Sequence, residues 1–252
     1  MTTATLALLF GSAVGAGIMN ALAGGGTLLT FPALLLAGVP AIRANATSTV
    51  ALVPGAAASL AGYRREVGAH RRWLTTLLVP SLLGGAIGSV LLLMTPEKIF
   101  ERLAPWLVLF ATLLFFFQIL WARRRSEAHA PEPSSWALAS VAQFFAAIYG
   151  GYFGAGVGIV MLVILGGLGL TDIHAMNGLK NFFGICINGV AALYFIVRGA
   201  VDWQLALLMT AGAILGGFVG AGFARRIGKE KARVAVVVIG LGITVVLFLQ
   251  RH

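Results

Sequence analysis

Long apolar runs, separated by short charged segments, follow one another along the whole sequence. Six runs without Asp, Glu, Lys or Arg have 17 to 24 residues, and two are much longer. A helix rises 1.5 Å per residue, so about 20 apolar residues cross the roughly 30 Å of hydrocarbon in a bilayer. The pattern therefore predicts membrane-spanning helices. The eight runs are 1–42, 44–63, 73–96, 103–122, 133–171, 181–197, 203–224 and 234–250.

The two longest runs are too long for a single crossing. As continuous helices, residues 1–42 and 133–171 would extend about 63 Å and about 58 Å. Both contain glycine clusters, Gly24–Gly26 and Gly154–Gly158, and glycine weakens a helix interior by about 1 kcal/mol relative to alanine. Close helix packing also favours glycine, but the run length requires a break. We expect a helical hairpin with a non-helical break in each run, and Thr27 as the cap of the first returning helix.

The two halves of the chain repeat one pattern. A first-half position matches the residue 130 to 132 places further on. A charged segment with prolines separates the copies. We expect a first membrane repeat at 1–121, a cytoplasmic linker at 122–135 and a second membrane repeat at 136–252. The matched positions are Gly26 with Gly156, Tyr63 with Tyr194, Gly84-Gly85 with Gly216-Gly217, and Gln118 with Gln250.

The basic residues predict how the halves are oriented. If each long run enters and leaves on one face, twelve Lys and Arg residues lie on one side and five on the other. If each long run crosses once, the split is nine to eight. Because basic loops prefer the cytoplasm, the first arrangement is favoured. It predicts an all-α polytopic integral membrane protein of two inverted repeats, each a glycine-broken helical hairpin plus three membrane-spanning helices. Both termini then lie on the non-cytoplasmic side of the membrane. The N-terminal run lacks a positive start, so we read it as a membrane segment and not as a signal peptide.

Paired glycine-broken segments in inverted repeats are typical of secondary transporters, whose substrate site lies where the repeats meet. Backbone N–H groups freed at a helix break, together with the helix dipole, attract anions. We therefore expect an anion site between the two breaks. Its backbone positions are Gly24, Gly25, Gly26 and Thr27 in the first break and Gly154 and Gly156 in the second.

Two polar clusters inside the spans supply candidate side chains, "RANATST" after the first break and "HAMNGLKN" after the second. A lysine in a span is costly unless it meets an anion, a carboxylate or water, although snorkelling to the membrane surface is an alternative for Lys180. Hydroxyl residues near a helix start are also common caps, and Asn-Ala-Thr formally matches a glycosylation acceptor. The candidates are Arg43 (a reserve near the outer face), Asn45, Thr47, Ser48 and Thr49, with Asn177, Lys180 and Asn181 from the second repeat.

Composition excludes several other functions. The chain is 59% hydrophobic and 10% charged, and the bases behind its net charge of +10 sit in short clusters between apolar runs, unlike a nucleic-acid groove. It has no nucleophile-elbow, zincin, P-loop or Cys-x-x-Cys motif, so we expect no enzyme activity, metal or cofactor. No Asp or Glu lies inside a span, which argues against coupling through a membrane carboxylate. We interpret the single cysteine, Cys186, as a small hydrophobic residue of the protein core.

Two glycine-rich stretches carry a resemblance, "NALAGGGTLLTFPALLLAGVPAIRANATSTVALVPGAAAS" and its degenerate repeat "YGGYFGAGVGIVMLVILGGLGLTDIHAMNGLKNF". They resemble the sulfite exporter TauE/SafE family, over essentially the whole chain. The resemblance implies a bacterial inner-membrane permease that exports small oxyanions or organosulfur compounds, such as sulfite or sulfoacetate. Family members often carry a Thr-Ser pair in both repeats. Here the first repeat keeps the pair at Thr47-Ser48, whereas the second repeat has Gly178-Leu179 in its place. We expect the charge of Lys180 to compensate for the missing hydroxyl groups.

We therefore expect a secondary transporter that exports a small anion such as sulfite or an organosulfonate. An uptake carrier for a small organic or sulfur-containing anion is one alternative. A non-transporting accessory subunit is another, and it would tolerate Lys180→Ala and Thr47→Ala, whereas a carrier would lose flux. The expected partners are the anionic substrate and the lipid bilayer, with a homodimer as an open option and no nucleic acid.

Overall fold

The computed structural model describes the whole chain except residues 23, 61–63, 125–134, 228 and 250–252. The described part is helical and contains no strand, which confirms the predicted all-α class. The helices are α1 (Thr3–Leu22), α2 (Thr27–Leu36), α3 (Ala41–Leu60), α4 (Arg64–Ala69), α5 (Arg71–Met94), α6 (Glu97–Arg124), α7 (Trp136–Tyr152), α8 (Val157–Gly167), α9 (Ile173–Val197), α10 (Trp203–Ile227) and α11 (Lys229–Leu249).

Both long apolar runs are broken at glycines, as predicted. Gly24 and Gly25, between α1 and α2, have φ of +83° and +92°. Gly154 and Gly156, between α7 and α8, have φ of +81° and +77°. Residues with a side chain rarely adopt this left-handed region, so glycine lets the chain reverse between two helices. Gly158, expected within the second break, instead lies in the first turn of α8, which starts directly after Gly156.

Five of the described helices, α1, α5, α6, α9 and α10, are long and apolar enough to cross a membrane by length and composition. They agree with the predicted polytopic membrane protein. The shorter apolar helices include α2 and α8, which are the returning arms of the hairpins. α3 is not among the five; it carries Asn45, Thr47 and Ser48, each of which is at most 1% exposed.

The predicted linker lies mostly outside the described residues. Residues 122–124 form the end of α6, and 125–134 are not described. Ser135 is the N-cap of α7, where its side chain accepts a hydrogen bond from the N–H of Leu138 at 3.2 Å. Of the matched pairs in the duplication, Tyr63 and Gln250 also fall outside the described residues.

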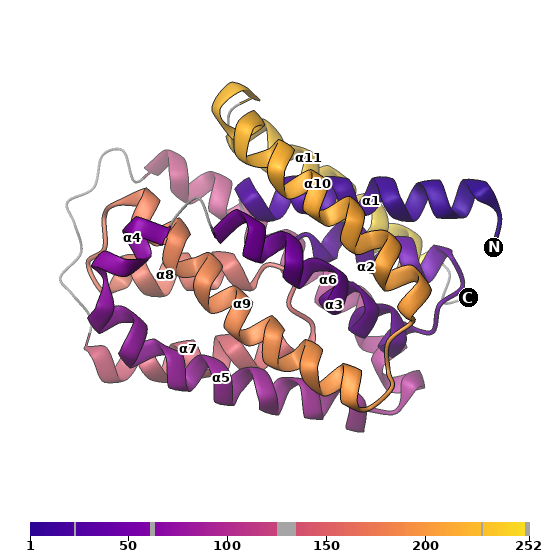
Figure 1. Ribbon diagram of the computed structural model, residues 1–252, viewed down its shortest axis with the longest axis horizontal. Helices are drawn as coiled ribbons and strands as arrows, with labels where there is room; N and C mark the ends of the chain where they lie inside the picture. The colour runs from indigo at the N-terminus through magenta and orange to yellow at the C-terminus, as the bar shows by residue number, and fades with distance from the viewer. Residues whose placement is uncertain (23, 61–63, 125–134, 228, 250–252) are drawn as a thin grey trace.

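The two hairpins begin and end at different ends of the molecule (Figure 1). α3, α6 and α10 begin at the right-hand end of Figure 1, where α1 starts. The N–H of Ile42 in α3 donates to Glu97 in α6, and the N–H of Asp202, just before α10, donates to Thr47 in α3. α4 lies at the left-hand end, with the starts of α5 and α7. The first hairpin begins on the right with α1 and ends there, because α2 leads into α3. The second begins on the left with α7 and ends there, because α8 leads into α9, which packs on α4.

The long helices pack mainly across the two halves of the chain. α1 lies along α10, α5 along α7 and α6 along α11. Glycines permit the close approach: a methyl group added to Gly216 would overlap the carbonyl oxygen of Val14, and one added to Gly84 would overlap Phe144. Membrane helices, which gain little from hydrophobic association, pack through such small-residue contacts. The halves therefore form one interlocked bundle.

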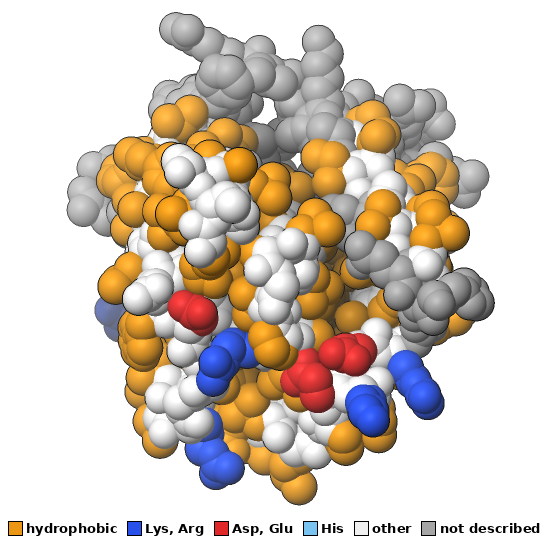
Figure 2. All heavy atoms as spheres, turned by 90° about the vertical axis from the view of Figure 1, so that its right-hand side faces the viewer, with side chains coloured by type: hydrophobic (Ala, Val, Ile, Leu, Met, Phe, Trp, Pro, Cys, Tyr) orange, Lys and Arg blue, Asp and Glu red, His pale blue; other side chains and the backbone are white. Residues whose placement is uncertain are grey.

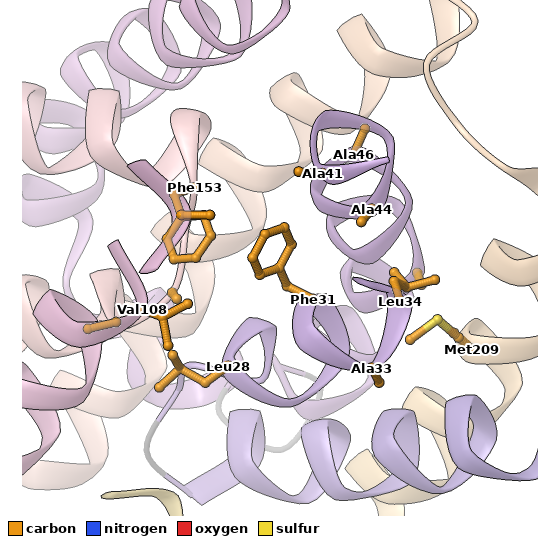
Figure 3. Close-up of a cluster of buried hydrophobic side chains, with 14 of the residues drawn as sticks. Leu28, Phe31, Ala33, Leu34, Ala41, Ala44, Ala46, Val108, Phe153 and Met209 are labelled. Carbon is orange, nitrogen blue, oxygen red and sulfur yellow. The ribbon is translucent and has the colours of Figure 1, made fainter. Parts of the chain in front are cut away.

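An aromatic cluster holds α2 in place. Phe31, Phe100 and Phe153 are at most 1% exposed, and Figure 3 shows Phe31 and Phe153 facing each other. The ring centroids are 5.3 Å apart for Phe31–Phe153 and 6.2 Å apart for Phe31–Phe100, both edge to face. Each such pair contributes about 0.5–1.5 kcal/mol beyond its buried area. α2, the returning helix of the first hairpin, is thereby fixed against the end of α7, the first helix of the second hairpin.

Apolar side chains cover the sides of the bundle, as expected for a surface in contact with lipid. Phe110, Leu193, Leu207 and Phe218 are between 47% and 68% exposed. Exposed apolar surface of this extent marks contact with a membrane or a partner. The right-hand end is different, because acidic and basic side chains gather there (Figure 2).

We predict that Gly216→Ala and Gly84→Ala each destabilise the protein by about 1–3 kcal/mol, because the added methyl groups force α1 from α10 and α7 from α5. Thermal unfolding in detergent measures the effect. Gly11→Ala in α1 is the matched control, since nothing lies within 4 Å of its added methyl group. Equal stability of Gly11→Ala and Gly216→Ala would show that the close contact is absent.

Candidate functional site

A small cavity lies where the two broken hairpins meet. Its volume is about 60 Å³. A cavity needs at least about 10–15 Å³ to hold one water, so this one has room for a few water-sized groups. Its lining comes from both breaks and from α3 and α9. The lining residues are Asn20, Gly24, Gly25, Thr27, Thr49, Leu52, Ala56, Gly154, Val157, Gly158, Met161, Lys180, Asn181, Gly184 and Asn188.

The backbones of the two breaks adjoin at this cavity. A methyl group placed on Gly24 would lie 3.7 Å from Cα of Gly158 and 4.0 Å from Nζ of Lys180. One placed on Gly25 would lie 3.6 Å from the backbone nitrogen of Gly156 and would overlap the ring of Phe115. Glycine at these two positions therefore serves both the positive φ and the close approach of the two hairpins.

Lys180 brings a positive charge to the cavity. It lies in α9 and is 3% exposed, next to Asn181 at 8%. Removing an ammonium group from water is costly unless opposite charge or hydrogen-bond acceptors compensate for it. None of the described residues that line the cavity is Asp or Glu. The cavity is therefore electropositive.

Two helix N-termini strengthen this positive field. α2 follows its N-cap Gly26, and α8 follows its N-cap Gly156; neither N-cap residue has a capping side chain. The expectation that Thr27 caps α2 is wrong, because Thr27 is already the first residue of the helix. Instead, the N–H of Gly26 donates to Oδ1 of Asn20 at 2.8 Å. The N-terminus of a helix carries about half a positive charge, and both termini border the cavity.

Seven residues of the predicted site line this cavity: Gly24, Gly25, Thr27, Thr49, Gly154, Lys180 and Asn181. Gly26 and Gly156 flank it as the N-caps. The hydroxyl group of Thr49 donates to the carbonyl oxygen of Asn45 at 2.9 Å, so its hydrogen is directed at the backbone. The oxygen of Thr49 can still accept a hydrogen bond in the cavity.

The two hydroxyl residues before Thr49 do not line the cavity. Thr47 accepts a hydrogen bond from the N–H of Asp202 at 3.0 Å, next to the start of α10. The hydroxyl group of Ser48 lies 2.6 Å from that of Thr30 in α2. Both side chains connect α3 to neighbouring elements.

The remaining candidates also lie away from the cavity lining. Asn45 donates through Nδ2 to the carbonyl oxygen of Tyr152 at 3.0 Å, which connects α3 to the end of α7. Arg43 is exposed at the start of α3, and Asn177 is buried in α9 on the side of Lys180 nearer the helix start.

Two amides of the cavity, Asn20 and Asn188, are not among the residues predicted from the sequence. Lys180, Gly184 and Asn188 follow one another at i, i+4 and i+8, the spacing that places residues on one helix face. Applied to the lysine, this spacing would have identified Asn188. Asn20 is an amide in an otherwise apolar run just before the first glycines. The other lining residues missed are apolar or glycine: Leu52, Ala56, Val157, Gly158, Met161 and Gly184.

The polar groups of the cavity include several hydrogen-bond donors: an ammonium group, the NH₂ groups of three side-chain amides and the N-termini of two helices. This set suits a small anion. No group of three His, Cys, Asp or Glu in the described part of the chain could hold a metal ion. Cys186 is half-buried in α9 and does not line the cavity.

Three proteins that are named as probable membrane transporters resemble this chain along its length. It is 30% identical over 242 residues to a "probable membrane transporter protein" of Haemophilus influenzae, covering 95% of this chain and 92% of the relative. It is 27% identical to "probable membrane transporter protein ORF9" of a Sinorhizobium species, covering 95% of this chain and 91% of the relative. It is 26% identical to "probable membrane transporter protein YfcA" of Escherichia coli K12, covering 98% and 91%.

The family model described as "Sulfite exporter TauE/SafE" matches residues 9–247. The match includes both breaks and every residue that lines the cavity. The protein therefore belongs to the sulfite exporter TauE/SafE family of membrane transporters.

Proposed function

We propose that this protein carries a small anion across the membrane through the cavity at Lys180. The observation that supports this most directly is the buried Lys180 in a cavity whose described lining contains no acidic side chain. An oxyanion that leaves water must recover several strong hydrogen bonds. Donors to a charged group contribute roughly 1.5–3 kcal/mol each, and the cavity offers several. Membership of a transporter family also implies a permease rather than an enzyme.

The cavity size favours an anion of a few atoms. Space for a few water-sized groups suits sulfite, a short organosulfonate or a small carboxylate. The name of the family points to sulfite. We therefore propose export of sulfite or a small organosulfonate as the specific activity.

The membrane potential is sufficient to drive such export. An anion leaving a cell that is negative inside gains about 2.3 kcal/mol per charge for each 100 mV, and a divalent anion gains twice as much. No carboxylate that could bind a coupling proton or sodium ion lines the described part of the cavity. A carrier of this kind works by the gradient of its own substrate and by the potential.

We further propose that the two halves are inverted repeats in an inner membrane and that the left-hand end of Figure 1 faces the cytoplasm. The hairpins begin and end at opposite ends, and the pairing of α1 with α10 corresponds to that of α7 with α5 when the halves are exchanged. Arg71 and Arg72, exposed at the start of α5, place positive charge at the left-hand end. This orientation follows the positive-inside rule and puts both termini outside the cytoplasm.

We predict that Lys180→Gln weakens anion binding by roughly 10- to 150-fold, because a charged donor contributes about 1.5–3 kcal/mol. Lys180→Arg should lose less, since it keeps the charge. Thermal-shift titrations with sulfite, sulfate, thiosulfate, sulfoacetate and small carboxylates measure binding, and flux into proteoliposomes measures transport. Arg198→Gln, which removes an exposed positive charge at the other end of α9, is the control. Wild-type binding and flux in Lys180→Gln would place the charge outside the site.

We predict that Gly24→Ala stops transport while Gly199→Ala does not. Both glycines have positive φ, so both alanine variants should lose about 1–2 kcal/mol of stability. Only at Gly24 does the new methyl group enter the cavity, 4.0 Å from Nζ of Lys180, whereas nothing lies within 4 Å of one at Gly199. Flux is compared with the unfolding temperature of each variant. Equal flux in the two variants would contradict a substrate path past Gly24.

We predict from the proposed orientation that a phosphatase fused after His252 is active and a fluorescent protein fused there is dark, because both termini lie outside the cytoplasm. A fluorescent protein inserted in the 125–134 segment should fluoresce and serves as the internal control. The opposite pattern at both positions would reverse the orientation, and like signals at both would contradict the inverted repeats.

A further inference from the structure

Asn20 has no role in the site predicted from the sequence, yet it lies at the first break and lines the cavity. We propose that Asn20 contacts the transported anion directly and that its amide makes the first break selective for anions. This inference rests on the proposed function, since it assigns a further residue to the same cavity. It is carried by one hydrogen bond and by an asymmetry between the two breaks.

The hydrogen bond fixes how the amide is oriented. The N–H of Gly26 donates to Oδ1 of Asn20 at 2.8 Å, and a backbone N–H can bond only to the oxygen of the amide. The NH₂ group is therefore the free end of the side chain. To the described residues Asn20 makes no other side-chain hydrogen bond. The residue lines the cavity, and its Nδ2 atom lies 2.9 Å from where a methyl group on Gly26 would sit, at the start of α2. These N–H bonds are therefore the donors that Asn20 can offer to an acceptor in the cavity.

The second break has no equivalent side chain. The residue 130 positions after Asn20 is Gly150, which lies within α7. The hydroxyl group of Tyr149 donates to the carbonyl oxygen of Ala155 at 2.6 Å, so at this break a side chain satisfies a backbone acceptor and not a donor. Two side chains of α9 also line the cavity. Nζ of Lys180 lies 4.0 Å from a methyl group placed on Gly24 of the first break, and Oδ1 of Asn188 lies 3.4 Å from one placed on Gly154 of the second. The donors of Lys180 and Asn20 are thus both on the side of the first break, where we propose that the anion meets them.

The two roles of Asn20 can be separated by one substitution. Aspartate caps a helix N-terminus about as well as asparagine, so Asn20→Asp keeps an oxygen for the N–H of Gly26. The same substitution replaces the NH₂ donor with a carboxylate oxygen. The new negative charge shares the cavity with Lys180 and neutralises its attraction for an anion. Asn20→Ala, in contrast, removes both the oxygen that accepts from the N–H of Gly26 and the NH₂ donor.

The test compares unfolding temperature without anion and affinity for sulfite in Asn20→Asp and Asn20→Ala, with purified full-length protein. We expect Asn20→Asp to unfold at or above the wild-type temperature and to bind sulfite about 100-fold or more weakly. Asn20→Ala should unfold at a lower temperature and lose roughly 10- to 150-fold in affinity. Gln204→Glu, the same chemical change at an exposed residue near the start of α10, should keep wild-type affinity.

The outcomes distinguish this inference from the proposed function. Undiminished sulfite affinity in Asn20→Asp, with weakened binding in Lys180→Gln, overturns the role of Asn20 and leaves the anion carrier intact. If Asn20→Asp does not fold, Asn20→Ala decides, and wild-type affinity there overturns the inference. A wild-type protein that binds none of the anions overturns both proposals. An equal loss of affinity in Gln204→Glu would show that net charge, and not the cavity, controls binding, and would also overturn the inference.

Discussion

The structure depends on one constraint: backbone N–H and C=O groups freed at a helix break need partners, and hydrocarbon supplies none. Each of the two hairpins has such a break. The N–H of Gly26 is taken by Asn20, and the carbonyl oxygen of Ala155 is taken by Tyr149. The remaining exposed backbone is covered because the two breaks lie against each other, inside a bundle in which each half packs on the other. The cavity is the space left at this junction.

The length of the apolar runs was enough to predict the breaks, and the charge of Lys180 was enough to single out this residue, which lines the cavity. A broken helix and a charged side chain are both energetically costly in a membrane unless other groups compensate for them. The polar cluster of α3 was harder to interpret. Thr47, Ser48 and Thr49 are consecutive, so on a helix their side chains point in three directions about 100° apart. Only Thr49 reaches the cavity, while Thr47 meets Asp202 and Ser48 meets Thr30. The sequence shows that these residues are polar, but their neighbours decide which of them face the cavity.

The internal duplication has a similar limit, because it relates positions and does not reveal neighbours. It matches Gly84 with Gly216, but it does not show that Gly84 packs on α7 and Gly216 on α1. Those contacts depend on how the halves interlock. The electrostatic character of the cavity was more accessible to prediction, since it depends on one lysine and two helix starts. In the proposed carrier, one full and two partial positive charges would hold an anion without the many fixed ligands that would prevent its release.

The glycine contacts along α1–α10 and α5–α7 also determine which parts of the protein can move. Backbones packed this closely resist sliding, because the neighbouring turns would collide. We therefore expect each pair to move as one body, and each joins one helix from the first half of the chain to one from the second. α3 packs on α10 and α9 packs on α5, while α3 and α9 also pack on each other. A hinge motion that exposes the cavity to one side and then to the other would thus separate two mixed bodies, with the seam running between the breaks rather than between the sequence repeats.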